Sequence, residues 1–288
     1  MHDLPAKPYL AFDLGAESGR AVLGRLHSGI ITIEEIHRFS NEPVQYGGSL
    51  HWDVPRLWLE MRRALSRLEK VELAGIGVDA WGVDFALLEE NGGLLQNPYH
   101  YRDQRTRGVM DIVFKRVSRE AIYRETGIQF IPINTLYQLF AAKRDVPKVL
   151  QAAKTLLTIP DLFHYWLTGN AVCEFTNATT TQMVNPLTRT WARDLIERLE
   201  LPSKLPAEIV DPGTVIGALR NDVASETSLA GTPVIAPASH DTGSAVAAIT
   251  ARDGTAFLSS GTWSLIGVEL DQPILSAEAL RLNFTNEG

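Results

Sequence analysis

The chain has 288 residues, of which 45% are hydrophobic and 21% charged, as expected for a globular protein with one large domain or two smaller ones. Its formal net charge of −7 argues against nucleic acid or an anionic membrane surface as the main partner, but it does not exclude a local phosphate site. No segment approaches the ~20 apolar residues that span a bilayer, and no signal-peptide pattern precedes the first strand, so we expect a cytoplasmic protein. The single cysteine, Cys173, cannot form an internal disulfide and is expected to be a buried small side chain.

The N-terminal region predicts a meander of three antiparallel strands. Residues 9–14 form a short apolar run, residues 20–26 return after a glycine turn, and residues 30–36 alternate between apolar and polar side chains. A helix is expected next, because Asp53 is placed to cap it and apolar residues then recur at helical spacing through Leu68.

Another strand and a hairpin complete this first unit. Residues 73–78 are continuously apolar, which is typical of a strand buried on both faces of a parallel or mixed sheet. The Asn91-Gly92 pair within residues 85–95 predicts a tight hairpin turn. The order of three meandering strands, helix, strand and hairpin resembles the ribonuclease-H-like α/β unit of actin-like ATPases, a mixed sheet with flanking helices.

The second half predicts helices, strands and a domain boundary. We expect helices after Asn134, between Pro160 and Gly169, and over residues 242–249 as a closely packed helix, with strands at residues 155–159 and 233–238. Residues 251–254 look like a hinge. We therefore divide the chain into a first domain at residues 1–250 and the beginning of a second at residues 251–288, which is too short to fold alone.

Two similar stretches suggest phosphate binding. Residues 9–20 and 255–267 each read as a strand, a turn rich in Gly, Ser or Thr, and a returning strand, and such turns let backbone N–H groups converge on a phosphate. Asp13 ends the first strand, where a carboxylate could orient metal-bound water, and Arg20 could neutralise phosphate oxygens. The alternative is a plain hairpin whose glycines serve the turn. The repetition favours two turns that face one nucleotide.

The sequence Ser239-His240-Asp241-Thr242-Gly243 lies between an apolar strand and a helix of small residues. Asp241 is the candidate general base, because a carboxylate can accept the proton of an attacking hydroxyl in phosphoryl transfer. Its alternative role is to cap the helix that starts near Thr242. His240 could bind a sugar hydroxyl, although an isolated histidine is more often a packed or surface residue.

Polar and aromatic residues after the buried strand suggest a sugar site. Residues 79–84 combine Trp81, the bare Gly82 and two carboxylates, which suits a polyol with hydroxyls and C–H faces. Residues 101–105 gather further donors and acceptors. The alternative for both is a solvated turn with ion pairs. Neither a zinc-ligand spacing nor a G-x-S-x-G nucleophile elbow is present.

Taken together, the motifs resemble those of the FGGY family of carbohydrate kinases, and several are specific to the branch that phosphorylates L-rhamnulose. The resemblance extends over essentially the whole chain and rests on residues 12–20, 36–39, 77–85, 101–105, 126–130, 134–139, 176–182, 238–242 and 258–264.

This resemblance implies ATP-dependent phosphorylation of the C1 hydroxyl of L-rhamnulose, with Mg²⁺, in the breakdown of rhamnose. It implies Asp241 as the proton acceptor and Asp13 near the metal through water. It further implies that the sugar is lined by Gly82, His240, Asp241 and Thr242, and that ATP contacts Ala16, Glu17, Ser18, Gly19, Arg20 and Thr262.

One departure from the family pattern affects the expected activity. Family members usually continue with an adenosine-binding, Gly-rich segment after the position where this chain stops, so we expect a truncated nucleotide side. The alternatives are therefore a catalytically silent sugar-binding fragment, a kinase for another ketose or polyol, and an actin-like ATPase that serves assembly. Glu17 adds a negative charge to the phosphate turn, so its side chain should point away from the phosphates or toward metal-bound water.

Overall fold

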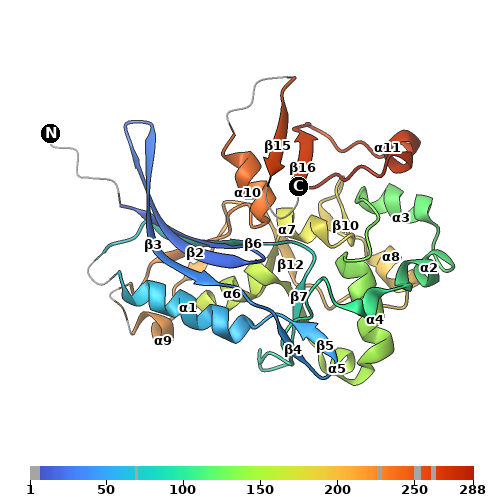
Figure 1. Ribbon diagram of the computed structural model, residues 1–288, viewed down its shortest axis with the longest axis horizontal. Helices are drawn as coiled ribbons and strands as arrows, with labels where there is room; N and C mark the ends of the chain where they lie inside the picture. Colours follow the sequence, from blue (N-terminus) through green and yellow to red (C-terminus); the bar gives the residue numbers. More distant parts are fainter. Residues whose placement is uncertain (1–6, 69–70, 226, 228, 250–253, 261–263) are drawn as a thin grey trace.

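The computed structural model describes residues 7–68, 71–225, 227, 229–249, 254–260 and 264–288. The strands of its central sheet are β1 (Tyr9–Leu14), β2 (Ser18–His27), β3 (Ile30–Ser40), β6 (Gly75–Ala80), β13 (Val215–Ala218) and β14 (Pro233–Ile235). They lie in the order β13-β14-β6-β1-β2-β3, and Figure 1 shows β2 and β3 as a long ribbon at one end of the molecule. β1 pairs antiparallel with β2 but parallel with β6, and β6 is parallel with β14.

This sheet confirms the predicted ribonuclease-H-like order. The three-stranded meander forms as expected, because alternate side chains of β1 and β2 point into the core. β3 is longer than predicted. The predicted strand at 73–78 begins and ends two residues later, at Gly75 and Ala80, and lies between the parallel strands β1 and β14.

Two helices cover one face of the sheet, as Figure 1 shows: α1 (Val54–Ser66) and α6 (Ile159–Thr168). The predicted cap of α1 is confirmed, because the Asp53 carboxylate accepts the N–H of Arg56, and Leu57 and Met61 are buried on its inner side. α6 ends where Gly169 adopts the left-handed conformation that closes a helix. Within the described residues no helix is long and apolar enough to cross a membrane.

The remaining short elements build a lobe beside the sheet. Its strands pair as β4 (Val44–Tyr46) with β5 (Ser49–His51), β7 (Phe85–Leu88) with β8 (Thr155–Thr158), β9 (Val172–Glu174) with β12 (Glu208–Val210), and β10 (Val184–Asn185) with β11 (Thr190–Trp191). Its helices are α2 (Val109–Phe114), α3 (Arg119–Thr126), α4 (Thr135–Asp145), α5 (Pro147–Ala152), α7 (Phe175–Thr180) and α8 (Arg193–Arg198), with a 3₁₀ turn at Gln104–Thr106; α9 (Asn221–Ala224) lies under the sheet (Figure 1).

The predicted hairpin at residues 85–95 forms, but its returning strand is short. Gly92 has a positive φ, the Glu89 N–H donates to the Gly93 carbonyl, and the Leu95 N–H donates to the Leu87 carbonyl on either side of a single bridge between Leu88 and Leu94. The strand partner of β7 is β8, from a segment 70 residues later. Cys173, in β9, is fully buried as predicted.

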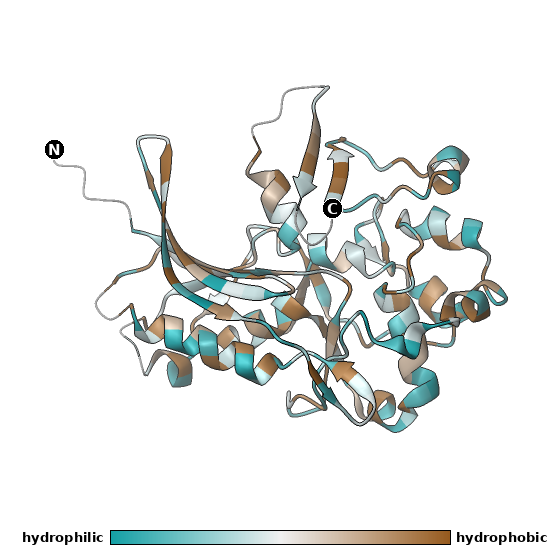
Figure 2. Ribbon diagram, in the orientation of Figure 1, coloured by the Kyte–Doolittle hydropathy of each residue, from teal (hydrophilic) through white to brown (hydrophobic). Residues whose placement is uncertain are grey.

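The chain ends with α10 (Asp241–Ala247), a β15 (Ala256–Ser260) to β16 (Ser264–Val268) ribbon, and α11 (Ala277–Arg281). The prediction of a closely packed helix at 242–249 is wrong about its packing, because α10 has no buried residue. The two strands of the second predicted unit are confirmed as an antiparallel pair, and Leu258 and Ile266 on them are exposed. Figure 2 shows that both strands carry hydrophobic residues. Of the predicted hinge at 251–254, residues 251–253 lie outside the described residues, and Gly254 is an exposed turn residue with a positive φ.

Candidate functional site

Three carboxylates from distant segments meet at one edge of the central sheet. Asp13 lies near the end of β1 and Asp79 near the end of β6, and the parallel register places the two residues side by side. Asp241 begins α10, which follows β14, and the neighbouring His240 forms a parallel bridge with Ala80 at the end of β6. The carboxyl ends of parallel strands are where ligands bind in open α/β sheets.

The environment changes the acidity of two of these groups. Burial, together with the nearby carboxylates of Asp13 and Asp241, raises the pKa of Asp79 to about 8, because burial and like charges both oppose ionisation. Burial also raises the pKa of Asp241, although His240 and the N–H and hydroxyl of Thr242 partly offset this. The Asp241 side chain is still 38% exposed, so this more basic carboxylate is accessible to a ligand.

Asp241 is not the N-cap residue of α10, which corrects the alternative of a simple cap. The N-cap position belongs to His240, whose side chain caps nothing, and Asp241 is the first helical residue. Its Oδ1 accepts the backbone N–H of Thr242 at 2.6 Å and the Thr242 hydroxyl at 3.2 Å. These bonds occupy Oδ1, and no hydrogen bond to Oδ2 is found among the described residues.

The first glycine turn is held by a residue that the sequence reading missed. The buried Asn41 donates its amide to the Gly15 carbonyl at 2.8 Å, and its backbone N–H donates to the Glu17 carbonyl at 3.0 Å. The Gly15 N–H bonds the Ser18 carbonyl across the turn. The signal in the sequence was one asparagine after β3, which looked like part of a polar loop.

The predicted phosphate residues lie in this turn and in β2. Ala16 and Glu17 are in the turn, and Glu17 is exposed. The Arg20 Nε donates to Asp13 Oδ2 at 2.8 Å, with both side chains more than a third exposed, so the cation lies at the same edge as the carboxylates. Ser18 stands beside Gly19 at the start of β2. The predicted contact Thr262 lies outside the described residues, and so does the turn of the second ribbon.

Gly19 has a packing role that the sequence reading did not assign. A Cβ at this buried position would lie 2.3 Å from the ring of Phe39 on β3, so no larger residue fits without displacing that ring. The bare glycine therefore serves strand packing as well as the turn.

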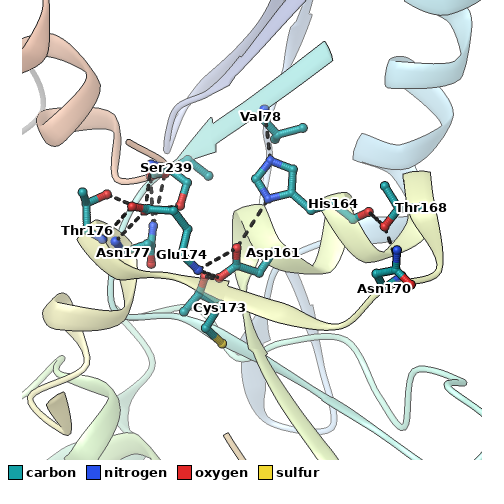
Figure 3. Close-up of polar contacts among 12 residues, drawn as sticks. Val78, Asp161, His164, Thr168, Asn170, Cys173, Glu174, Thr176, Asn177 and Ser239 are labelled. Atoms are coloured by element: carbon teal, nitrogen blue, oxygen red, sulfur yellow. Dashed lines mark hydrogen bonds and ion pairs between the residues drawn. The ribbon is translucent and has the colours of Figure 1, made fainter. Parts of the chain in front are cut away.

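A buried carboxylate anchors the loop that carries Asp241, as Figure 3 shows. Glu174, at the end of β9, accepts the backbone N–H and the hydroxyl of Ser239 at 2.9 and 2.7 Å. It also accepts the N–H and hydroxyl of Thr176 and the N–H of Asn177 at the start of α7. The Thr176 hydroxyl in turn accepts the His240 N–H at 3.1 Å. One side chain thus joins α7 to the loop before α10.

A second buried carboxylate extends this network to the central sheet (Figure 3). Asp161 of α6 accepts the Glu174 N–H and the Thr158 hydroxyl, and its Oδ1 lies 3.4 Å from His164 Nδ1. The other ring nitrogen of His164 accepts the Val78 N–H of β6 at 3.3 Å. The network therefore fixes the loop before Asp241 relative to the strand that carries Asp79.

Of the residues predicted to bind the sugar, some remain candidates for lining it, and others hold the surrounding protein in place. Gly82 approaches Thr180 so closely that a Cβ would lie 2.9 Å from the Thr180 side chain, and the Thr180 hydroxyl accepts the Val83 N–H. Asp84, in contrast, is fully buried, and protein donors occupy its oxygens, among them the indole N–H of Trp81. Burial outweighs the opposing hydrogen bonds from Gln138 and the indoles and raises the pKa of Asp84 to about 6. The expectation that Asp84 contacts a polyol is therefore wrong, and it orients Trp81 instead.

Residues 101–105 also hold neighbouring protein groups in place, so the alternative of a solvated turn is wrong for Tyr101 and Arg105. Tyr101 is buried and its N–H donates to Asp84, while the Arg105 guanidinium stacks 3.8 Å from the Tyr99 ring centre and bonds the Gln138 side chain. Within the described residues, no group of three or more His, Cys, Asp or Glu side chains is arranged to bind a metal ion directly.

Comparison with known proteins gives a consistent result. The profile of the FGGY family of carbohydrate kinases, N-terminal domain, matches residues 8–248. The chain is 45% identical over 281 residues to a rhamnulokinase of Oceanobacillus iheyensis and 46% identical over 291 residues to one of Pectobacterium atrosepticum. These matches cover 97% and 99% of this chain but 60% and 58% of the relatives, so the chain spans about three-fifths of their length.

Solved structures share the fold. A carbohydrate kinase of Novosphingobium aromaticivorans superimposes with a TM-score of 0.81 at 25% identity, covering 95% of this chain and 58% of that one. A xylulose kinase of Rhodospirillum rubrum superimposes with a TM-score of 0.72 at 22% identity, covering 80% and 49%.

Proposed function

The chain belongs to the FGGY family of carbohydrate kinases, and from this premise we propose that the protein transfers the γ-phosphate of ATP to the C1 hydroxyl of L-rhamnulose in the cytoplasm. The choice of sugar rests on the relatives named rhamnulokinase, which are 42–46% identical to this chain. We further propose that residues 1–250 hold the sugar and that residues 251–288 belong to the nucleotide side.

The observation that carries the proposal is the position and chemistry of Asp241. Its carboxylate has a raised pKa and is 38% exposed, and Thr242 occupies Oδ1 but not Oδ2. In the proposed step, Asp241 accepts the proton of the C1 hydroxyl while that oxygen bonds to the γ-phosphorus. The bond between this phosphorus and the bridging oxygen of ADP breaks, and ADP leaves with the bonding electrons.

The sugar would lie against the loop and strand end that surround this carboxylate. We propose that Gly82, held close to Thr180 in the loop after β6, lies along the sugar. The Trp81 ring is buried and donates its indole N–H to Asp84, so it supports this loop. The imidazole of His240 and the side chain of Thr242 lie next to Asp241, where they would line the sugar.

The phosphates would lie at the first turn. Ala16 to Gly19 offer backbone N–H groups, and Arg20, now paired with Asp13, offers a cation. Thr262 is proposed as a further ATP contact. Oxygen donors fit Mg²⁺, and the Asp13 carboxylate at this edge would hold the ion through water; when bound, Mg²⁺ neutralises phosphate charge.

The test compares sugars and one substitution in the natural full-length protein. ADP formation should be fastest with L-rhamnulose, and equal or faster turnover with L-fuculose or D-xylulose would overturn the choice of substrate. Asp241→Asn keeps the size of the side chain but removes its basicity, so kcat should fall roughly 10²–10⁴-fold with an unchanged melting temperature.

The matched control is Asp222→Asn, which removes an exposed carboxylate paired with Arg220 and should leave kcat unchanged. Unchanged turnover in Asp241→Asn would refute its role as the base. Sugar binding in calorimetry without any ADP formation would instead support the second reading, a silent sugar-binding protein.

A further inference from the structure

The segment after the second ribbon runs back across the first domain and ends beside the candidate site. In Figure 1, α11 lies next to α3 and the C-terminus lies near α7. Several hydrogen bonds anchor this segment. They join Tyr123 Oη to the Phe284 carbonyl, the Phe130 N–H to Asn283 Oδ1, the Asn286 N–H to the Gly127 carbonyl, Asn286 Nδ2 to the same carbonyl, and the Gly288 N–H to Thr179 Oγ1.

This docking places one more carboxylate on the candidate site. Glu287 Oε2 lies 3.1 Å from Nδ1 of His240, while the other ring nitrogen, Nε2, lies 3.5 Å from Asp241 Oδ1. The second oxygen of Glu287 accepts the Thr285 hydroxyl at 3.3 Å. A nearly buried imidazole, 11% exposed, therefore lies between two carboxylates, one from α10 and one from a segment 46 residues later.

The two contacts on the ring determine which way it faces. With Nδ1–H donated to Glu287, the remaining nitrogen, Nε2, points at Asp241. The His240 backbone is already fixed by its N–H bond to Thr176, so Glu287 acts on the rotation of the side chain alone.

The charges of the three groups are consistent with an ion pair. Burial alone would lower the pKa of His240, but Glu287 and Asp241 outweigh it and raise the pKa. Burial would likewise raise the pKa of Glu287, but the imidazole outweighs it and lowers the pKa. As an imidazolium, His240 bonds Glu287 through Nδ1 and is attracted by the charge of Asp241, which lies 3.5 Å from Nε2.

We propose that Glu287 is a positioning residue for the sugar-phosphorylating site: it orients the His240 imidazole, which in turn holds Oδ1 of Asp241 and leaves Oδ2 directed at the sugar hydroxyl. This inference rests on the proposed function, since it assigns His240 and Asp241 to the sugar. It also means that the site is complete only when the segment at 272–288 is docked on the first domain.

The test is Glu287→Gln in the natural full-length protein, with Glu278→Gln as the matched control. Glu278 lies in the same segment but pairs in solvent with Arg281. Because a charged hydrogen bond is replaced by a neutral one, kcat/KM for L-rhamnulose should fall roughly 10–100-fold in Glu287→Gln and stay unchanged in Glu278→Gln. In a His240→Gln background, Glu287→Gln should have little additional effect, because the proposed route passes through the ring.

A second measurement separates this inference from the proposed function. The pH titration of the His240 ring, followed by NMR without any sugar, should shift to lower pH in Glu287→Gln only. If the wild-type protein phosphorylates no sugar while this shift occurs, the proposed function fails but the contact between Glu287 and His240 stands. An active enzyme in which Glu287→Gln changes neither the titration nor kcat/KM would overturn the inference, as would a full effect of Glu287→Gln in the His240→Gln background.

Discussion

Replacing Glu174 by glutamine tests whether the buried network holds the Asp241 loop. The side chain of Glu174 is fully buried and accepts five hydrogen bonds, from the N–H and hydroxyl of Thr176, the N–H of Asn177, and the N–H and hydroxyl of Ser239. Glutamine has nearly the same shape but is neutral, and one of its two terminal atoms is a donor. Every partner of Glu174 is a donor in this arrangement, so the amide cannot satisfy them all.

The size of the effect follows from these bonds. In the best orientation of the glutamine, its oxygen takes the place of Glu174 Oε2, which accepts four hydrogen bonds. Its NH₂ group then replaces Oε1 and faces the N–H of Thr176, which loses its acceptor. Each of the four retained bonds loses about 1 kcal/mol because its acceptor is no longer charged, and the unpaired N–H costs about 1–3 kcal/mol. Removing a buried charge recovers several kcal/mol of desolvation. We therefore expect a net loss of about 3 kcal/mol in the free energy of unfolding.

Thermal unfolding followed by circular dichroism measures this loss. A change of about 3 kcal/mol in a protein of this size corresponds to a melting temperature roughly 6–12 °C lower. The matched control is Glu200→Gln, because Glu200 also bonds two partners, Lys143 and Arg116, but is 67% exposed. Exposed ion pairs contribute little, so the control should melt close to the wild-type temperature.

Two results would contradict this reasoning. A Glu174→Gln protein that melts with the wild type would mean that the network does not stabilise the fold. Equal losses in both variants would mean that neither the burial of Glu174 nor its larger number of hydrogen bonds adds stability. We also expect Glu174→Gln to phosphorylate the sugar more slowly than the wild type, even at temperatures well below its melting transition, since the loop with Ser239 loses its anchor.

Three further predictions test other parts of the structure. Asp79→Asn should stabilise the protein more at pH 8 than at pH 5 in urea unfolding. The native pKa of Asp79 is about 8 and its ordinary value is 3.8, so between these values the native carboxyl binds more protons than the unfolded one and wild-type stability falls as pH rises. A stability difference that is independent of pH would contradict this. Gly19→Ala should lower the free energy of unfolding by about 1–3 kcal/mol, because the new methyl group collides with Phe39. Gly24→Ala lies in the same strand, where the methyl group meets no neighbour, and should unfold at nearly the wild-type urea concentration. Similar curves for both variants would be evidence against the packing role of Gly19. Burial raises the pKa of the Cys173 thiol well above its usual range, so an aromatic disulfide reagent should modify it only in urea, and rapid modification of the native protein would show that the thiol is accessible.

The local elements were predictable because their signals are local. The apolar run at residues 9–14, the strand that returns at 20–26 after the glycine turn, the cap at Asp53 and the helix end at Gly169 each depend on neighbours within a few positions, and the structure confirms all of them. The family was also predicted, because its motifs are short continuous strings, and the profile match confirms it.

Pairings across long separations were not predictable in the same way. The local turn at Asn91-Gly92 was predictable and forms a short hairpin, but nothing local indicates that β7 also pairs with β8, a segment about 70 residues later. Asp84 appeared equivalent to other polar residues near Trp81, but four donors from separate segments surround it and exclude a ligand. Nothing near Glu174 or Asn41 in the sequence indicates that each fixes a loop from another part of the chain.

The sequence alone determined that Asp13, the glycine turn after it and Asp241 are candidates for phosphoryl transfer, since residue type and the strand-turn pattern are written along the chain. Only the tertiary structure decided that Asp79 joins the two carboxylates and that Glu287 reaches His240. The physical reason is that the parallel register of β1 and β6 and the docking of residues 272–288 are set by burial and hydrogen bonds between segments far apart in the chain. Electrostatic effects depend on distance in space, so the acidity of these groups could be assigned only after the fold had brought them together.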